Sequence, residues 1–185
     1  MCDIAKASKR ARTELKQHKG VQFYLGLLSI SYWQEHALDA LLVWLQDEPS
    51  HVAKHMEAPL GVAQLQVVIE AKNNASFINM LEPLLKILYN SPPVNRALGR
   101  IRPELGVSPF VSALVQRLQH PNALVRRLVL SILTLIYERH QAPKQLVEKH
   151  QLEPVLRGIK ENDPGVLVQQ MASQLHRSFE SHDVL

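Results

Sequence analysis

"ALDALLVWLQDEP", residues 37–49, has a counterpart in "MLEPLLKILYNSP", residues 80–92, which begins forty-three residues later. Leucine occupies the same four places in both stretches, namely Leu38, Leu41, Leu42 and Leu45 in the first and Leu81, Leu84, Leu85 and Leu88 in the second. This spacing brings the four leucines to one face of a helix. The two stretches therefore predict two amphipathic helices of one kind, each needing a neighbour to cover its leucines.

The same helical pattern returns further along the chain. It is clear in residues 128–137, where Tyr137 follows Tyr89 by 48 residues, and weak in residues 171–179, where Phe179 follows Tyr137 by 42. A period of this size is typical of armadillo and HEAT repeats, whose units share a core that none can close alone. We expect the third unit to add Leu128, Ile132 and Leu135 to that core, with Trp44 packed at the position equivalent to Leu135.

Between the leucine-rich helices, the chain predicts a brief helix followed by a second apolar helix. Pro59, Pro109 and Pro154 suit the first turn of these second helices, where a missing N–H has no cost. No alternating strand pattern is present. We therefore predict an all-α fold, a right-handed α-solenoid of about four armadillo/HEAT-like repeats.

The net positive charge of the chain comes from its N-terminal segment. Residues 1–20 carry six basic and two acidic side chains, whereas the remaining 165 residues carry fifteen of each. We predict that residues 1–20 form a basic N-terminal capping helix or a partial repeat, and that residues 21–185 form the armadillo-like repeat domain. The inward face of the first helix would hold Ile4, Ala7, Ala11 and Leu15. A basic arm for a membrane or nucleic acid is the alternative.

Apolar runs and cysteine content indicate where the protein resides. The longest apolar runs fall far short of the ~20 residues that cross a bilayer. We see no leader peptide, and Cys2, the only cysteine, has no partner for an intramolecular disulfide. We expect a soluble protein of the cytoplasm or another reducing compartment, with no membrane span.

Motifs that carry catalysis or bind phosphate are absent from the sequence. No Gly-rich phosphate loop, zinc-protease motif or kinase motif occurs, so we predict neither enzymatic activity nor a cofactor. His51 and His55 are four residues apart, as two metal ligands can be, but no third ligand accompanies them. We favour an exposed polar helix without metal there, and caps or surface positions for His120, His140 and His150.

The residues best suited to recognise a partner are arginines and one tryptophan. Between residues 94 and 127 lie six arginines and one acid, and we name these arginines as partner-binding candidates: Arg96, Arg100, Arg102, Arg117, Arg126 and Arg127. Arg96 and Arg100, one helical turn apart, suit a carboxylate or phosphate. Trp33 is a candidate aromatic anchor. The alternatives are a solubilising rim for the arginines and core packing for the tryptophan.

One stretch resembles a known family. "YWQEHALDALLVWLQDEPSHVAKHM", residues 32–56, is similar to the noncatalytic armadillo-like region of the septation-initiation-network protein kinases of fungi and of their plant relatives, the MAP kinase kinase kinase epsilon group. Tyr32-Trp33-Gln34, Ala37-Leu38-Asp39-Ala40 and Trp44-Leu45-Gln46-Asp47-Glu48 carry the resemblance, which extends over residues 21–159. It implies the regulatory part of a larger kinase, one that acts with a small Ras-like GTPase at the spindle pole body and controls cytokinesis. No binding motif comes with it.

Fold and resemblance together predict a protein-interaction module of a cytokinesis kinase. Its expected partner is a small Ras-like GTPase or another component of the kinase pathway, in the cytoplasm and at the spindle pole or centrosome. An independent adaptor of the importin or cell-adhesion kind is the alternative, and direct binding of nucleic acid is a third. The sequence is also compatible with a homodimer.

Overall fold

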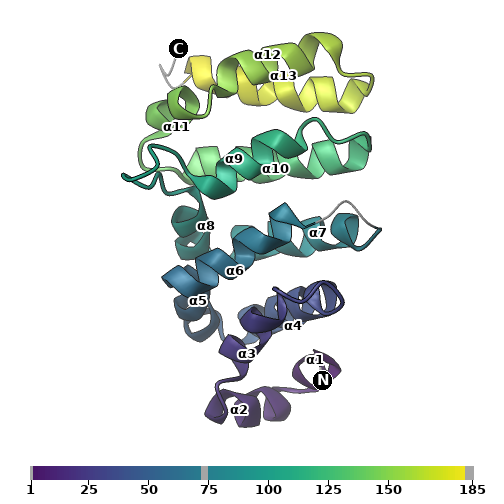
Figure 1. Cartoon of the computed structure of the whole chain (residues 1–185), viewed down its shortest axis with the longest axis vertical. Helices are drawn as coiled ribbons and strands as arrows, with labels where there is room; N and C mark the ends of the chain where they lie inside the picture. Colours follow the sequence, from purple (N-terminus) through teal and green to yellow (C-terminus); the bar gives the residue numbers. More distant parts are fainter. Residues whose placement is uncertain (1, 72–74, 182–185) are drawn as a thin grey trace. The chain divides into compact units, whose positions relative to one another are not determined.

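The computed structural model describes residues 2–71 and 75–181, and all the regular elements within them are α-helices (Figure 1). The one β-type pairing in these residues is an isolated antiparallel bridge between Arg102 and Val107. The prediction of an all-α protein is therefore confirmed. The chain divides into two compact units, Met1–Leu98 and Gly99–Leu185, and each is described by itself.

The first unit is built around a pair of adjacent helices that contain the two leucine-rich stretches. Its helices are α1 (Cys2–Ala7), α2 (Lys9–Gln17), α3 (Gly20–Leu27), α4 (Gln34–Asp47), α5 (Pro49–Glu57), α6 (Pro59–Glu70), α7 (Ala75–Asn90) and the start of α8 (Pro92–Gly99). Helix α4 packs along α7 and also contacts α1, α3 and α5. The two stretches thus cover each other's apolar faces.

Most of the repeated leucines lie in the interior of this unit. Seven of the eight are buried, and Leu85 is half-buried because it lies at the edge of the helical stripe centred on Leu81, Leu84 and Leu88. Trp44 is fully buried, with its ring edge-on to Tyr24 at 6.2 Å. Burying one leucine stabilises a fold by roughly 1.5–3 kcal/mol, so these helices depend on their neighbours.

The N-terminal segment differs from the single helix that we expected. Ser8 interrupts it, since its side chain accepts a hydrogen bond from the Ala11 N–H at 3.1 Å and caps α2. The expected inward face is wrong for Ile4 and Ala7, which are exposed, whereas Ala11 and Leu15 are half-buried. Ala5 and Arg12 are buried in their place.

Arg12 explains why this segment is arranged differently. Its Nε and Nη2 both donate to Asp47 Oδ2 at 3.1 Å, and its Nη1 donates to the Ala5 carbonyl at 2.8 Å. The ion pair to α4 holds the guanidinium inside, because a buried charge needs a partner of opposite sign. Helix α1 packs against α4 as well.

The second unit contains α9 (Pro109–Arg117), α10 (Ala123–Arg139), α11 (Pro143–Lys149), α12 (Leu152–Asn162) and α13 (Val166–Ser181). Helix α10 contacts α9 and α13, and α13 packs along α12. Ile132 and Leu135 are buried as expected of core residues, whereas Leu128 is half-buried at the edge of the same stripe. The Tyr137 hydroxyl donates to the Ser178 carbonyl at 3.0 Å and so joins α10 to α13.

Two turns in the chain share an unusual backbone. Lys19 and Gln151, with φ of 56° and 51°, are the described non-glycine residues in the left-handed region, and each is the N-cap of the helix that follows it. A histidine, His18 or His150, precedes each of them as the C-cap of the previous helix. The two turns are 132 residues apart, which equals three intervals of 44. That interval falls within the range of 42 to 48 residues seen in the leucine pattern.

Candidate functional site

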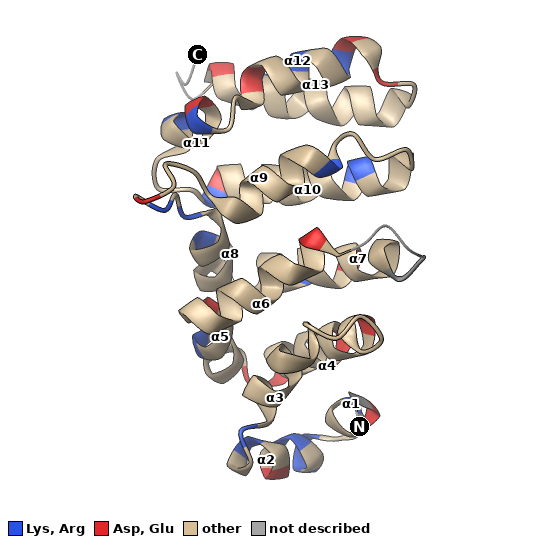
Figure 2. Cartoon of the chain, viewed as in Figure 1, with Lys and Arg blue, Asp and Glu red and all other residues tan. Residues whose placement is uncertain are grey.

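Helices α3 and α6 of the first unit carry a surface that is almost free of charge. The two helices contact each other, and the Ser29 hydroxyl just beyond α3 donates to Gln64 Oε1 of α6 at 2.5 Å. Helix α3 has no charged residue, and α6 has only Glu70, its last residue. Figure 2 shows both ribbons tan over almost their whole length. A solvent-facing helix normally carries charges on its outer side, so this pair is exceptional.

Large apolar side chains are exposed on these two helices and on the turn after α3. Phe23 is 45%, Ile30 49% and Leu60 65% exposed. We call the exposed apolar positions of the two helices and the turn after α3 the α3–α6 face: Phe23, Gly26, Ile30, Leu60 and Ala63. Apolar groups gathered on a surface are typical of sites where another protein binds.

Gly26 leaves the middle of this face without a side chain. A Cβ added at Gly26 would meet no atom within 4 Å, so packing within the protein does not require glycine there. Glycine inside a helix costs about 0.5–1 kcal/mol relative to alanine. The exposed backbone allows a partner to approach α3 closely.

Basic side chains lie on the chain just before α3. Helix α2 contacts α3 and exposes Lys9 and Arg10 at its start, and exposed Lys19 is the N-cap of α3, four residues before Phe23. Lys16 is already paired, since its Nζ donates to Glu48 Oε2 at 2.5 Å and this bond lowers the pKa of Glu48. An apolar surface beside a basic helix suits a partner that combines apolar and acidic side chains.

The two arginines that we predicted to act together differ in local structure. Arg96 is exposed on α8, and exposed Arg100 directly follows the end of that helix at Gly99. Their joint binding of a carboxylate or phosphate stays a prediction. Arg102 and Arg117 are half-buried, and Arg127 is exposed.

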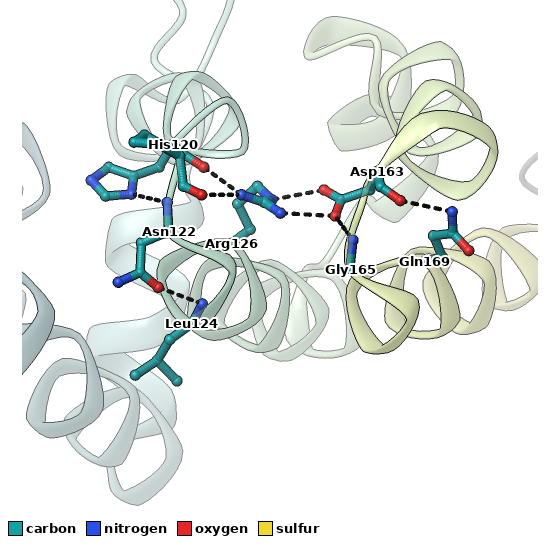
Figure 3. Close-up of polar contacts among 8 residues, drawn as sticks. His120, Asn122, Leu124, Arg126, Asp163, Gly165 and Gln169 are labelled. Atoms are coloured by element: carbon teal, nitrogen blue, oxygen red, sulfur yellow. Dashed lines mark hydrogen bonds and ion pairs between the residues drawn. The ribbon is translucent and has the colours of Figure 1, made fainter.

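Arg126 is buried, so the prediction that it belongs to an exposed recognition surface is wrong. Its Nε donates to Asp163 Oδ2 at 2.7 Å and its Nη2 to Asp163 Oδ1 at 2.8 Å, while its Nη1 donates to the carbonyls of His120 and Pro121 (Figure 3). Burial by itself would raise the pKa of Asp163, but hydrogen bonds from Arg126 and from the Gly165 N–H outweigh it and hold that pKa below its usual value. Arg126 thus joins the α9–α10 turn to the α12–α13 turn.

Trp33, the predicted aromatic anchor, lies beside a more exposed aromatic residue, Tyr32. Trp33 is the half-buried N-cap of α4, and Tyr32, which is 76% exposed, meets it edge-on at 4.9 Å. Sequence reasoning named Trp33, yet Tyr32 is the more accessible ring. It also missed the α3–α6 face, although the absence of charge from residues 20–31 was visible in the sequence.

Histidines lie in two different environments. His51 and His55 stack edge-on at 5.0 Å on α5, and in residues 2–71 and 75–181 no group of three or more His, Cys, Asp or Glu is arranged to hold a metal ion. His150 occupies one of the predicted cap positions, since it is the C-cap of α11, but its side chain is buried. Its Nε2 accepts the Ser108 N–H at 3.1 Å and its Nδ1 lies 3.3 Å from Ser112 Oγ, so it ties α11 to the start of α9. Burial, assisted by the charge of His140, lowers the pKa of His150 to about 4.

Comparison with known proteins adds relatives that match along nearly the entire chain. The cytokinesis protein sepH of Emericella nidulans is 38% identical over 189 residues, which cover 99% of this chain and 13% of the relative. The chain is homologous to a segment of sepH. The sepH protein of Aspergillus niger is 37% identical, with 97% of this chain and 13% of the relative covered. MAP3K epsilon protein kinase 2 of Arabidopsis thaliana is 33% identical over 193 residues, with 100% and 14% covered.

These relatives extend the predicted resemblance beyond residues 21–159. The chain spans only 13–14% of the relatives that it matches, which fits a noncatalytic segment of a large kinase. No family model matches the chain, and no solved structure does. Among the described residues, no helix combines the length and apolar character that crossing a bilayer demands.

Proposed function

We propose that this chain is a noncatalytic, protein-binding regulatory module of a cell-division protein kinase related to sepH and the MAP3K epsilon kinases. The support is homology over almost all of the chain to a short segment of proteins named for cytokinesis and for kinase activity. An all-helical segment with a bare apolar surface is suited to binding rather than to chemistry.

The proposed architecture is a right-handed solenoid of armadillo-like repeats over residues 21–185, with residues 1–20 as a cap or partial repeat. The side-by-side pairs α4/α7 and α10/α13 support it, since repeat units cover each other's apolar faces. The left-handed turns at Lys19 and Gln151, three intervals of 44 residues apart, also support it.

The observation that carries the proposal is the α3–α6 face. Phe23 and Leu60 are large, apolar and exposed, so a partner that covers them would remove apolar surface from water. The exposed basic residues Lys9 and Arg10 of α2 and Lys19 at the start of α3 would orient an acidic partner and raise its association rate. The proposed partner is a small Ras-like GTPase or another component of the kinase pathway, bound in the cytoplasm and at the spindle pole or centrosome.

Direct binding to a purified GTPase tests this function. The 185-residue chain is immobilised, and Ras-like GTPases of the septation pathway are passed over it loaded with GTP analogue or GDP. We expect saturable binding that a Phe23→Asp/Leu60→Asp double variant weakens at least tenfold, since both side chains are exposed and the charges would be buried unpaired.

A matched variant controls for charge and folding. Leu124→Asp/Val166→Asp adds the same two charges at exposed apolar positions of the second unit and should bind within about twofold of the unchanged chain. Equal binding by the Phe23/Leu60 variant would exclude the α3–α6 face. If no GTPase binds but another pathway protein binds through this face, the proposed partner would be wrong and the proposed binding surface would stand.

A further inference from the structure

A hollow of about 540 Å³ opens in the second unit, between the C-terminal end of α9 with the turn after it and the helix α12. Ligand pockets in proteins commonly have volumes of about 300–1,000 Å³. Neither the α3–α6 face nor the proposed GTPase contact involves this region, so the hollow calls for its own explanation.

The walls of the hollow combine apolar side chains with polar groups, two of which are amides. Six lining residues are prolines or aliphatic: Leu118, Pro121, Pro154, Val155, Ile159 and Pro164. Gln119 and Asn162, both exposed, also line it, together with half-buried His120. Amide side chains offer both a donor and an acceptor, which are the groups that a peptide backbone presents.

The ion pair of Arg126 and Asp163 also lines the hollow, but its charges are directed at each other. The carboxylate receives two bonds from the guanidinium and one from the Gly165 N–H, and Nη1 of Arg126 is occupied by two carbonyls (Figure 3). A charged group entering the hollow would lose water without gaining an opposite charge. The hollow therefore complements a neutral occupant.

Gly158 keeps the hollow open. It lies on α12 among the lining residues, and a Cβ added there would meet no atom within 4 Å. Glycine weakens the interior of a helix, and nothing packed against it inside the protein requires its small size. A larger side chain at this position would fill the space itself.

We infer that this hollow binds a neutral, aliphatic segment of a partner polypeptide. A leucine-type side chain enters between the prolines and Ile159, and the Gln119 amide and Asn162 Oδ1 bond to the backbone on either side of it. Asn162 Nδ2 itself donates to the Gly158 carbonyl at 3.1 Å. Charge complementarity selects this occupant, because the lining offers apolar area and amide groups but no charge that lacks a partner. The inference does not depend on the GTPase proposed for the first unit.

A small peptide mimic provides the test. N-acetyl-leucine N-methylamide is titrated into the isotope-labelled 185-residue chain, and the backbone amide signals of Gln119, Gly158 and Asn162 are followed by NMR. We expect saturable shifts with a dissociation constant on the order of 1–10 mM, the range for a ligand of this size. The corresponding aspartate and lysine derivatives should bind at least fivefold more weakly.

Matched variants on α12 connect the shifts to the hollow. Gly158→Leu should weaken binding at least tenfold, Gly158→Ala should stay within about threefold, and Lys160→Leu, which adds the same side chain outside the lining, should change nothing. If the NMR spectrum of Gly158→Leu shows that this variant is unfolded, Pro154→Glu at the exposed edge of the hollow replaces it. This variant should also weaken binding at least tenfold. The inference is overturned by no saturable shift, by equal binding of the charged derivatives, or by full binding to the filled variant.

Discussion

Helices α3 and α12 begin at turns with the same left-handed backbone, yet they expose different chemistry. Lys19 and Gln151 precede them, and a glycine without internal contacts, Gly26 or Gly158, follows seven residues later in each. Helix α3 carries no charge, whereas α12 carries Glu153, Arg157, Lys160 and Glu161. A shared turn thus specifies where a helix starts and leaves its outer surface free to differ.

Buried neighbours account for the remaining differences between the two regions. Gly20, the first residue of α3, lies so close to Trp44 that a Cβ would come within 2.9 Å of its ring, whereas α12 begins with the buried Leu152. His18 before α3 is exposed, and His150 before α12 is buried against Ser108. After the same left-handed turn, α3 therefore starts with a glycine against a large neighbour, Trp44, whereas α12 starts with a leucine that is itself buried.

The largest expected loss of stability follows from replacing one of the two buried arginines. Arg126→Ala should lower the free energy of unfolding of the second unit by about 3–5 kcal/mol, since it leaves the Asp163 carboxylate buried and unpaired. Arg12→Ala should cost the first unit about 1–2 kcal/mol, because Asp47 is 24% exposed where Asp163 is 6% exposed. Urea titrations followed by circular dichroism measure both. Equal losses would mean that burial of the carboxylate does not distinguish the two regions.

A smaller effect concerns pH and the two histidines. His150 has a pKa of about 4 in the folded chain and 6.5 without burial, so between these values the unfolded chain binds more protons. Stability due to this group is complete above pH ~6.5 and is lost as pH falls toward ~4, by at most about 3 kcal/mol. Unfolding measured from pH 7 to 4 should show a shallower decline for His150→Gln. His18→Gln, at an exposed position, is the control, and parallel curves for all three proteins would contradict this role of His150.

Gly20 should be intolerant of even one added carbon. Gly20→Ala should destabilise the first unit by about 1–3 kcal/mol despite the better helix propensity of alanine, because the new Cβ presses on Trp44 and on the Leu15 carbonyl. Thermal unfolding by calorimetry measures the change. A stabilised variant would show that α3 can move away from α4 without loss.

The smallest effect has the opposite sign. Gly26→Ala and Gly158→Ala should each stabilise the chain by about 0.5–1 kcal/mol, since both positions are helical and open. The same unfolding assay applies to both. A loss of stability at either site would reveal a backbone conformation that alanine cannot adopt, and would weaken the parallel between α3 and α12.

Sequence reasoning succeeded where periodicity alone decides the outcome. The leucine spacing predicted helices α4 and α7, and seven of the eight residues named for them are buried. It failed where a residue's role depends on a distant partner. Arg12, Arg126 and His150 look like surface residues in the sequence, but each is buried against groups 35 or more residues away. Local spacing carries no information about such contacts.

The sequence by itself determined that this chain is helical, that its leucine faces need neighbours, and that it has relatives among cytokinesis proteins and MAP3K epsilon kinases. These properties follow from backbone periodicity and residue identity, which are local. Only the tertiary structure decided which arginines are withdrawn into ion pairs, that α3 and α6 together expose an uncharged apolar face, and that Gly158 borders a hollow. Those outcomes depend on which side chains meet across the fold, because burial and pairing set whether a charge is structural or available.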